Sequence, residues 1–128
     1  MEKNKLTLKE ILEDAVNNYK ARNIEKAEIS CHKILSIDSD YFPATLLLAN
    51  ISAQKKDFKK AKKLLEEVNE MQPNNPGILN NLGTACKELK ELNNAIIYYK
   101  KVIKIDPKNI NAYYNLGTTL YQLKDLKE

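Results

Sequence analysis

Few residues of this chain carry side chains that could do chemistry. His32 is the only histidine, and Cys31 and Cys86 are the only thiols. Neither cysteine stands in a CxxC pair, so we interpret both as small hydrophobic residues of a protein kept in a reducing compartment. A lone histidine without an acid or a nucleophile placed to meet it predicts no general-base site. The sequence therefore predicts no enzyme activity, no metal site and no cofactor.

Signals for nucleic acids and membranes are equally weak. The densest basic stretch, residues 55–63, is followed by Glu66, Glu67 and Glu70, within reach of pairs along one helix. Together with a net charge of only +4, this indicates a solvated helix face rather than a phosphate-binding surface. Charge-free runs such as residues 41–54 are shorter than the roughly 20 residues of a membrane span. We expect a cytoplasmic protein that binds neither nucleic acid nor membrane.

Asparagine supplies the binding chemistry that the chain does contain. Asn81 and Asn115 lie 34 residues apart, and each carboxamide is both a donor and an acceptor. Two asparagines at this spacing would bind the main chain of an extended peptide and would not select its side chains. An alternative stays open, because pairs such as Asn17-Asn18 and Asn93-Asn94 show that the chain also places asparagine where only solvent is expected.

The same spacing of 34 residues organises the whole chain. It relates three alanines, three leucines and two prolines: Ala27, Ala61 and Ala95; Leu48, Leu82 and Leu116; Pro73 and Pro107. This period divides the chain into repeats at 8–41, 42–75 and 76–109 and a partial repeat at 110–128. We treat residues 1–128 as a single domain built from these repeats.

Each repeat has the apolar spacing of two amphipathic helices. The pattern predicts seven helices, near residues 7–20, 24–37, 42–55, 58–71, 76–89, 92–105 and 110–123. Thr7 and Glu10 fit a capping box that opens the first of them. The predicted fold class is therefore all-α, with helical hairpins stacked in an α-solenoid.

The third repeat resembles the tetratricopeptide repeat (TPR) family. The resemblance rests on Leu79-x2-Leu82-Gly83, followed by Ala95, Tyr99 and Pro107. It implies a right-handed solenoid in which the first helix of each hairpin lines a concave groove that binds a protein or peptide segment. Carried onto this chain, it implies these peptide-binding residues: Asn50, Asn81, Lys87, Tyr114, Asn115 and Tyr121.

Two binding modes known in this family can be compared with the residues of the groove. Asn81 and Asn115 resemble the asparagine ladder of the O-linked N-acetylglucosaminyl transferases, which implies capture of a peptide backbone. The clamp that binds the acidic tails of heat-shock chaperones needs cations where Leu46, Asn111 and Asn115 stand here. We therefore expect the ladder mode and not the clamp mode.

The last predicted helix has an apolar stripe without a following helix in the sequence. Its four residues are Tyr113, Leu116, Leu120 and Leu123. An exposed stripe of this kind indicates docking of a second copy or of a downstream domain. We therefore predict a protein-interaction module that binds an extended peptide. The alternatives are the N-terminal repeat module of a larger glycosyltransferase or sulfotransferase, and a self-associating scaffold.

Overall fold

The computed structural model describes residues 6–127, which form seven α-helices with no strand among them. The helices are α1 (Leu8–Lys20), α2 (Ile24–Ile37), α3 (Phe42–Gln54), α4 (Phe58–Met71), α5 (Pro76–Glu88), α6 (Leu92–Ile105) and α7 (Ile110–Lys127). The predicted all-α fold is confirmed, and the first six helices begin and end within one residue of their predicted bounds. The last helix was predicted too short, because it continues four residues beyond 123.

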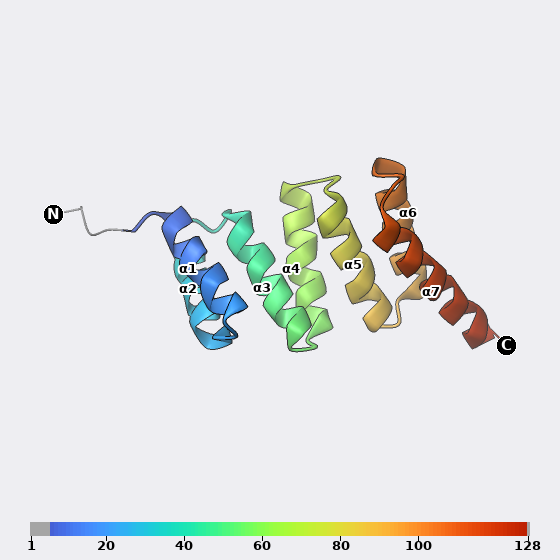
Figure 1. Ribbon diagram of the computed structural model, residues 1–128, viewed down its shortest axis with the longest axis horizontal. Coiled ribbons are helices and arrows are strands. Elements are labelled where there is room, and N and C mark those ends of the chain that lie inside the picture. Colours follow the sequence, from blue (N-terminus) through green and yellow to red (C-terminus); the bar gives the residue numbers. More distant parts are fainter. Residues whose placement is uncertain (1–5, 128) are drawn as a thin grey trace.

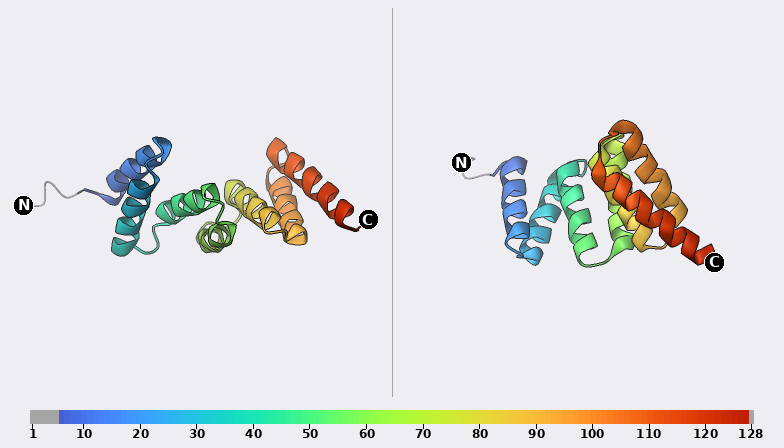
Figure 2. Two further views of the ribbon diagram at one scale, coloured as in Figure 1. Left: turned by 90° about the horizontal axis from the view of Figure 1, so that it is seen from below. Right: turned by 45° about the vertical axis from the view of Figure 1, so that its right-hand side comes forward.

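The helices form hairpins that follow one another along a right-handed solenoid. α1 packs on α2, α3 on α4 and α5 on α6, and the second helix of each hairpin packs on the first helix of the next. Figure 1 shows this row from the N-terminus at one end to the C-terminus at the other, and Figure 2 shows it from two further sides. α7 packs mainly on α6, and no further helix of the described chain covers its other side.

The three hairpin turns share one backbone conformation, 34 residues apart. Arg22, Lys56 and Lys90 all have a positive φ, between 65° and 67°. In the third turn, the Lys90 N–H donates to the Lys87 carbonyl and the Glu91 N–H donates to the Cys86 carbonyl, at 3.0 and 2.8 Å. The other two turns repeat this pair of bonds, which is the Schellman ending of a helix. In each turn, backbone N–H groups thus satisfy the carbonyls at the end of the helix. The residue with positive φ is arginine or lysine, where glycine is the usual residue.

Helix starts follow the capping signals of the sequence. The Glu10 N–H donates to the Thr7 hydroxyl, and the Glu10 carboxylate accepts from the Thr7 N–H, both at 3.1 Å. The predicted capping box is therefore confirmed. The Thr7 N–H and the Thr7 hydroxyl both donate to the Glu10 carboxylate, and these two bonds hold the pKa of Glu10 below its ordinary value. Asn75 caps α5 in a similar way, ahead of Pro76 in the first turn.

Small residues let the two helices of each hairpin approach closely. Ala27, Ala61 and Ala95, one period apart in the second helices, are fully buried. In α5, a Cβ atom on Gly83 would lie 2.5 Å from Cε1 of Tyr99, closer than real Cβ contacts allow. The Tyr99 ring therefore fills the space that glycine leaves. The Tyr99 and Thr84 hydroxyl oxygens lie 3.1 Å apart, so one donates to the other.

Two ion pairs connect neighbouring hairpins near their turns. Lys55 contacts Glu28 with 2.6 Å between Nζ and Oε1, and Lys62 contacts Glu91 at 2.5 Å. The hydrogen bond from Lys62 lowers the pKa of Glu91, and the same bond raises the pKa of Lys62. Both side chains of the second pair stay partly exposed, so this pair contributes only a small part of the stability.

Candidate functional site

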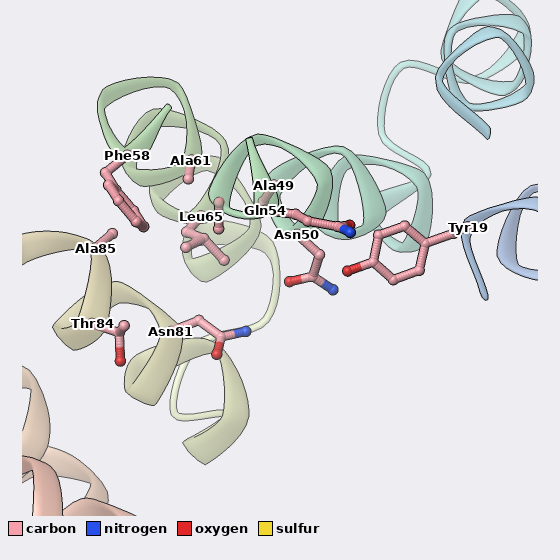
Figure 3. Close-up of a pocket in the computed structure, with 11 residues that line it drawn as sticks. Tyr19, Ala49, Asn50, Gln54, Phe58, Ala61, Leu65, Asn81, Thr84 and Ala85 are labelled. Atoms are coloured by element: carbon pink, nitrogen blue, oxygen red, sulfur yellow. The ribbon is translucent and has the colours of Figure 1, made fainter. Parts of the chain in front are cut away.

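The first helices of three hairpins meet around one pocket of about 320 Å³. Figure 3 shows Tyr19 reaching in from α1, Asn50 and Gln54 from α3, and Asn81 and Thr84 from α5. The remaining lining residues are small or apolar: Ala49, Ala53, Phe58, Ala61, Leu65 and Ala85. The pocket therefore lies on the face of the solenoid that the first helices line.

The side-chain amides of this pocket have no hydrogen-bonding partner among the described residues. Asn50, Gln54 and Asn81 make no side-chain hydrogen bond to any residue between 6 and 127. Asn81 is exposed and Asn50 is half-buried. Each carboxamide can donate and accept at once, which matches the alternating N–H and C=O groups of an extended peptide. The structure thus brings Asn50 and Asn81, two of the predicted binding residues, to one pocket.

The remaining polar and apolar groups limit what this pocket can bind. None of its lining residues is charged. Phe58 and Leu65 of α4 form an apolar floor beneath the amides. Such a pocket can take an uncharged apolar side chain while the amides bind the main chain beside it. Sequence reasoning missed Tyr19 and Phe58 as lining residues. Phe58 comes from a second helix, α4, whereas Tyr19 belongs to a first helix, α1, from which no binding residue was predicted.

The other predicted binding residues lie outside this pocket. The Lys87 ammonium donates to the Thr118 hydroxyl at 2.6 Å and so connects α5 to α7. The Asn115 carbonyl accepts from the hydroxyls of Thr118 and Thr119. Tyr114 and Tyr121 are 70% and 73% exposed on α7. The structure therefore divides the predicted set between the pocket and the last helix.

The predicted apolar stripe of α7 is only partly covered. Tyr113 is 50% exposed and Leu120 is 44% exposed, whereas Leu116 and Leu123 are half-buried. A Cβ atom on Gly117 would meet nothing within 4 Å. Gly117 follows Gly83 by one period, so the notch that Tyr99 fills on α5 is open on α7.

The candidate catalytic residues gain no partners from the fold. Cys31 and Cys86 are buried and unpaired, as predicted. Burial, with a smaller contribution from Glu28, raises the pKa of the Cys31 thiol to about 11, and burial also raises that of Cys86. Both thiols are thus protonated at neutral pH and poor nucleophiles. His32 is exposed.

The described residues contain neither a cluster of metal-ligating side chains nor a membrane-spanning helix. In residues 6–127, no three side chains of His, Cys, Asp or Glu lie together as a metal site would require. None of the helices in that range is both long and apolar enough to cross a bilayer.

Comparison with protein families gives two matches that together span most of the chain. A family described as "Tetratricopeptide repeat" matches residues 12–82, and one described as "TPR repeat" matches residues 83–124. The first match alone covers more than half of the chain. Comparison with curated proteins gives no significant match.

Several solved structures share this fold at low sequence identity. The first TPR domain of Spaghetti (RPAP3) bound to the HSP90 peptide SRMEEVD has a TM-score of 0.83 and 18% identity, over 89% of this chain and 90% of that one. YrrB, described as a TPR protein with an unusual peptide-binding site, has a TM-score of 0.85 and 22% identity, over 98% of this chain and 65% of YrrB. The Thermobaculum terrenum O-GlcNAc transferase has a TM-score of 0.80 and 20% identity, over 88% of this chain and 22% of the enzyme. At these identities the likeness establishes the fold alone.

Proposed function

This chain belongs to the tetratricopeptide repeat family, whose repeats form protein-interaction modules, and we propose that it binds an extended peptide segment in the pocket between α1, α3 and α5. One observation carries the proposal. Asn50 and Asn81 come from successive first helices, line one pocket and have no hydrogen-bonding partner within residues 6–127. The pocket supplies binding groups and no catalytic ones, which supports a role in recognition rather than in chemistry.

The lining of the pocket also indicates the kind of segment that binds. An uncharged pocket gives a carboxylate or an ammonium no counter-ion, and burial of an unpaired charge is costly. The peptide therefore inserts one apolar side chain over Phe58 and Leu65. Its flanking main-chain groups bind the amides of Asn50 and Asn81. Asn115, Tyr114 and Tyr121 extend the binding surface onto α7, with Lys87 between the two regions.

Two other functions remain as alternatives. In the first, the chain is the N-terminal repeat module of a larger glycosyltransferase or sulfotransferase and positions its protein substrate. This alternative rests on the Thermobaculum enzyme, because the region similar to this chain makes up only 22% of that enzyme. In the second, the chain is a scaffold that associates with itself through the exposed stripe of α7. Both alternatives still use these repeats for binding and not for catalysis.

Selection of peptides followed by direct titration tests the proposed function. A display library of random peptides is selected on the 128-residue chain, and the best binders are titrated by fluorescence anisotropy. Asn50→Ala/Asn81→Ala should weaken binding roughly tenfold or more, because main-chain groups of the peptide lose two amide partners. Asn93→Ala is the matched control, since Asn93 is an exposed asparagine on α6, away from the pocket.

The pattern of selected sequences and variants decides between the readings. Enrichment of one apolar position among neutral residues, with affinity lost only in the double variant, would support the pocket. Equal binding by the double variant, the control and the wild type would contradict it. Selection of acidic tails would contradict the uncharged pocket as the binding site.

A further inference from the structure

The open face of α7 repeats the residues with which α5 packs against its own hairpin partner. Asn81-Leu82-Gly83-Thr84 in α5 recurs as Asn115-Leu116-Gly117-Thr118 in α7. On α5 this face is covered by α6, and Leu82 and Gly83 are buried. On α7 the corresponding face holds the open notch at Gly117. Both helices thus have a notch at the glycine. Tyr99 fills the notch on α5, and the notch on α7 is open.

The filled copy defines what the open one can take. On α5, the notch at Gly83 accepts the Tyr99 ring from an antiparallel helix, so close that a Cβ atom would overlap it. An occupant of α7 therefore needs an antiparallel helix that presents an exposed aromatic ring. Tyr113 meets the second requirement, because it is half exposed and lies four residues before Gly117 on the same helix face.

We propose that α7 pairs with α7 of a second copy of this chain, antiparallel, with Tyr113 of each copy in the Gly117 notch of the other. Tyr113 and Gly117 lie four residues apart on one face of α7, with Asn115 midway between them. In an antiparallel pair centred on Asn115, Tyr113 of each copy therefore lies at the level of Gly117 of the other. Both notches are then filled by the same rotation. A two-fold axis across a helix makes the two helices antiparallel, which is also the direction of the helices in each hairpin.

The charges of α7 are compatible with pairing between identical copies. Residues 110–123 contain no charged side chain, although 30% of the chain is charged. Two identical helices can therefore approach over this length without opposing like charges. The charged residues of α7 lie beyond this segment, at Lys124, Asp125 and Lys127, outside the part that pairs around Asn115.

The concentration dependence of the molecular mass tests this association. A single pair of helices is a small interface, so we expect reversible, weak dimers that form between about 10 µM and about 1 mM. Analytical ultracentrifugation should show the mass rising from monomer to dimer over this range. Gly117→Leu fills the notch with no clash inside the monomer, and Tyr113→Ala removes the ring. Each should raise the dimer dissociation constant roughly tenfold or more.

Tyr114→Ala is the matched control for loss of the ring. Tyr114 is the adjacent tyrosine and more exposed than Tyr113, but neighbouring residues of a helix point in different directions, so its ring is not the one that enters the notch in this register. Its loss should leave the dimer constant unchanged. Binding of a groove-selected peptide should survive Gly117→Leu, so failure of the dimer and failure of the peptide site are distinguishable.

Disulfide trapping tests the direction of the two helices. Copies carrying Tyr113→Cys are mixed with copies carrying Gly117→Cys under mild oxidation. The two native thiols are buried and do not compete. In the antiparallel pair the new cysteines face each other, and the second Tyr113–Gly117 contact of the mixed dimer stays intact. The mixed disulfide should therefore exceed both homodimeric disulfides, whereas parallel helices would favour the homodimeric ones.

Three results would overturn the proposal. A monomer at every concentration would leave this face to a helix from another protein. A dimer unaffected by both Gly117→Leu and Tyr113→Ala would place the interface elsewhere. Preferred formation of homodimeric disulfides would exclude the antiparallel register.

Discussion

Helices α5 and α7 share the segment Asn-Leu-Gly-Thr at the same repeat positions and reach different environments. α5 lies between α4 and α6, and Leu79, Leu82 and Gly83 on its hairpin face are all buried. On α7, Tyr113 and Gly117 at the corresponding positions are exposed. The difference arises because α6 covers α5 and no helix of residues 6–127 covers that face of α7. The second helix of a hairpin thus decides whether this face of the first helix is buried or exposed.

The two helices also end differently over similar residues. Leu89-Lys90-Glu91-Leu92 turns the chain, with Lys90 in the left-handed region, whereas Leu123-Lys124-Asp125-Leu126 continues as helix. In the first segment, packing of α6 against α5 requires the turn. In the second, the residues stay in the helix, where lysine and leucine have good intrinsic propensity. Packing of the next helix therefore decides where a repeat turns.

Removal of the ring that fills the covered notch should have the largest effect. Tyr99 is fully buried, so Tyr99→Ala should cost about 3–5 kcal/mol in the free energy of unfolding, as for other large aromatic side chains. Tyr113→Ala should change the monomer by less than about 1 kcal/mol, because half of that side chain is exposed. Urea denaturation at low protein concentration measures both. Equal costs would contradict the contrast between the two faces.

A methyl group placed in each notch should have effects of opposite sign. Gly83→Ala brings a Cβ atom into the Tyr99 ring and should cost roughly 1–3 kcal/mol through overpacking. Gly117→Ala meets nothing within 4 Å and should stabilise the monomer by up to about 1 kcal/mol through helix propensity. Thermal melts of dilute samples report the signs. Destabilisation by Gly117→Ala under these conditions would show that the notch is already filled.

Glycine at the two lysines of the turn position should also act in opposite directions. Lys90→Gly removes the cost of a left-handed side chain and should stabilise the chain by roughly 0.5–1 kcal/mol. Lys124→Gly places glycine inside a helix and should cost about 0.5–1 kcal/mol, with reduced helical circular dichroism. If both variants were stabilised, residue 124 would be a turn and not part of α7.

The smallest expected effect concerns the ion pair at the covered hairpin. Glu91→Gln should cost roughly 0.2–1 kcal/mol, because the pair with Lys62 is partly exposed and screened by water. The pKa of Glu91 is lowered in the folded chain. Its contribution is therefore fully present above the ordinary pKa of glutamate and is lost as the pH falls through the lowered one.

Stability measurements at neutral and acidic pH check this contribution. The difference in unfolding free energy between Glu91→Gln and the wild type should shrink on acidification. The contribution of Lys62 to the pair is lost only at alkaline pH, because its raised pKa keeps the ammonium charged until the pH rises through that value. A difference that stayed constant from neutral to acidic pH would contradict a charged pair. Asp125, one period after Glu91, lies on α7, so Asp125→Asn is the control for the uncovered end.

Most of the fold could be predicted because one period recurs along the chain. Positions such as Ala27, Ala61 and Ala95 fixed the register, and breaks in the apolar pattern then placed the helix ends. The end of α7 could not be predicted in this way. Its residues 123–126 carry the local signals of a turn, and only the absence of a packed helix in the described chain keeps them helical.

The candidate site was less predictable than the fold. Asn50 and Asn81 could be assigned to the groove from their repeat positions, and both line the pocket. Leu47, at the position equivalent to Asn81, is buried in the core between α1 and α3 and does not line this pocket. Tyr19 of α1 and Phe58 of α4 also line the pocket, although neither was predicted. Repeat position thus indicates the side of the solenoid, but the size of neighbouring side chains decides which residues reach the surface.

Hydrogen exchange of backbone amides, measured residue by residue at two protein concentrations, tests the contrast between α5 and α7 most directly. At low concentration, amides on α5 should exchange only by global unfolding, whereas those in α7 should exchange faster through local opening. At high concentration, protection should rise on α7 around Tyr113 and Gly117 and stay unchanged on α5. Equal protection of both helices at both concentrations would contradict the uncovered face and its pairing with a second copy.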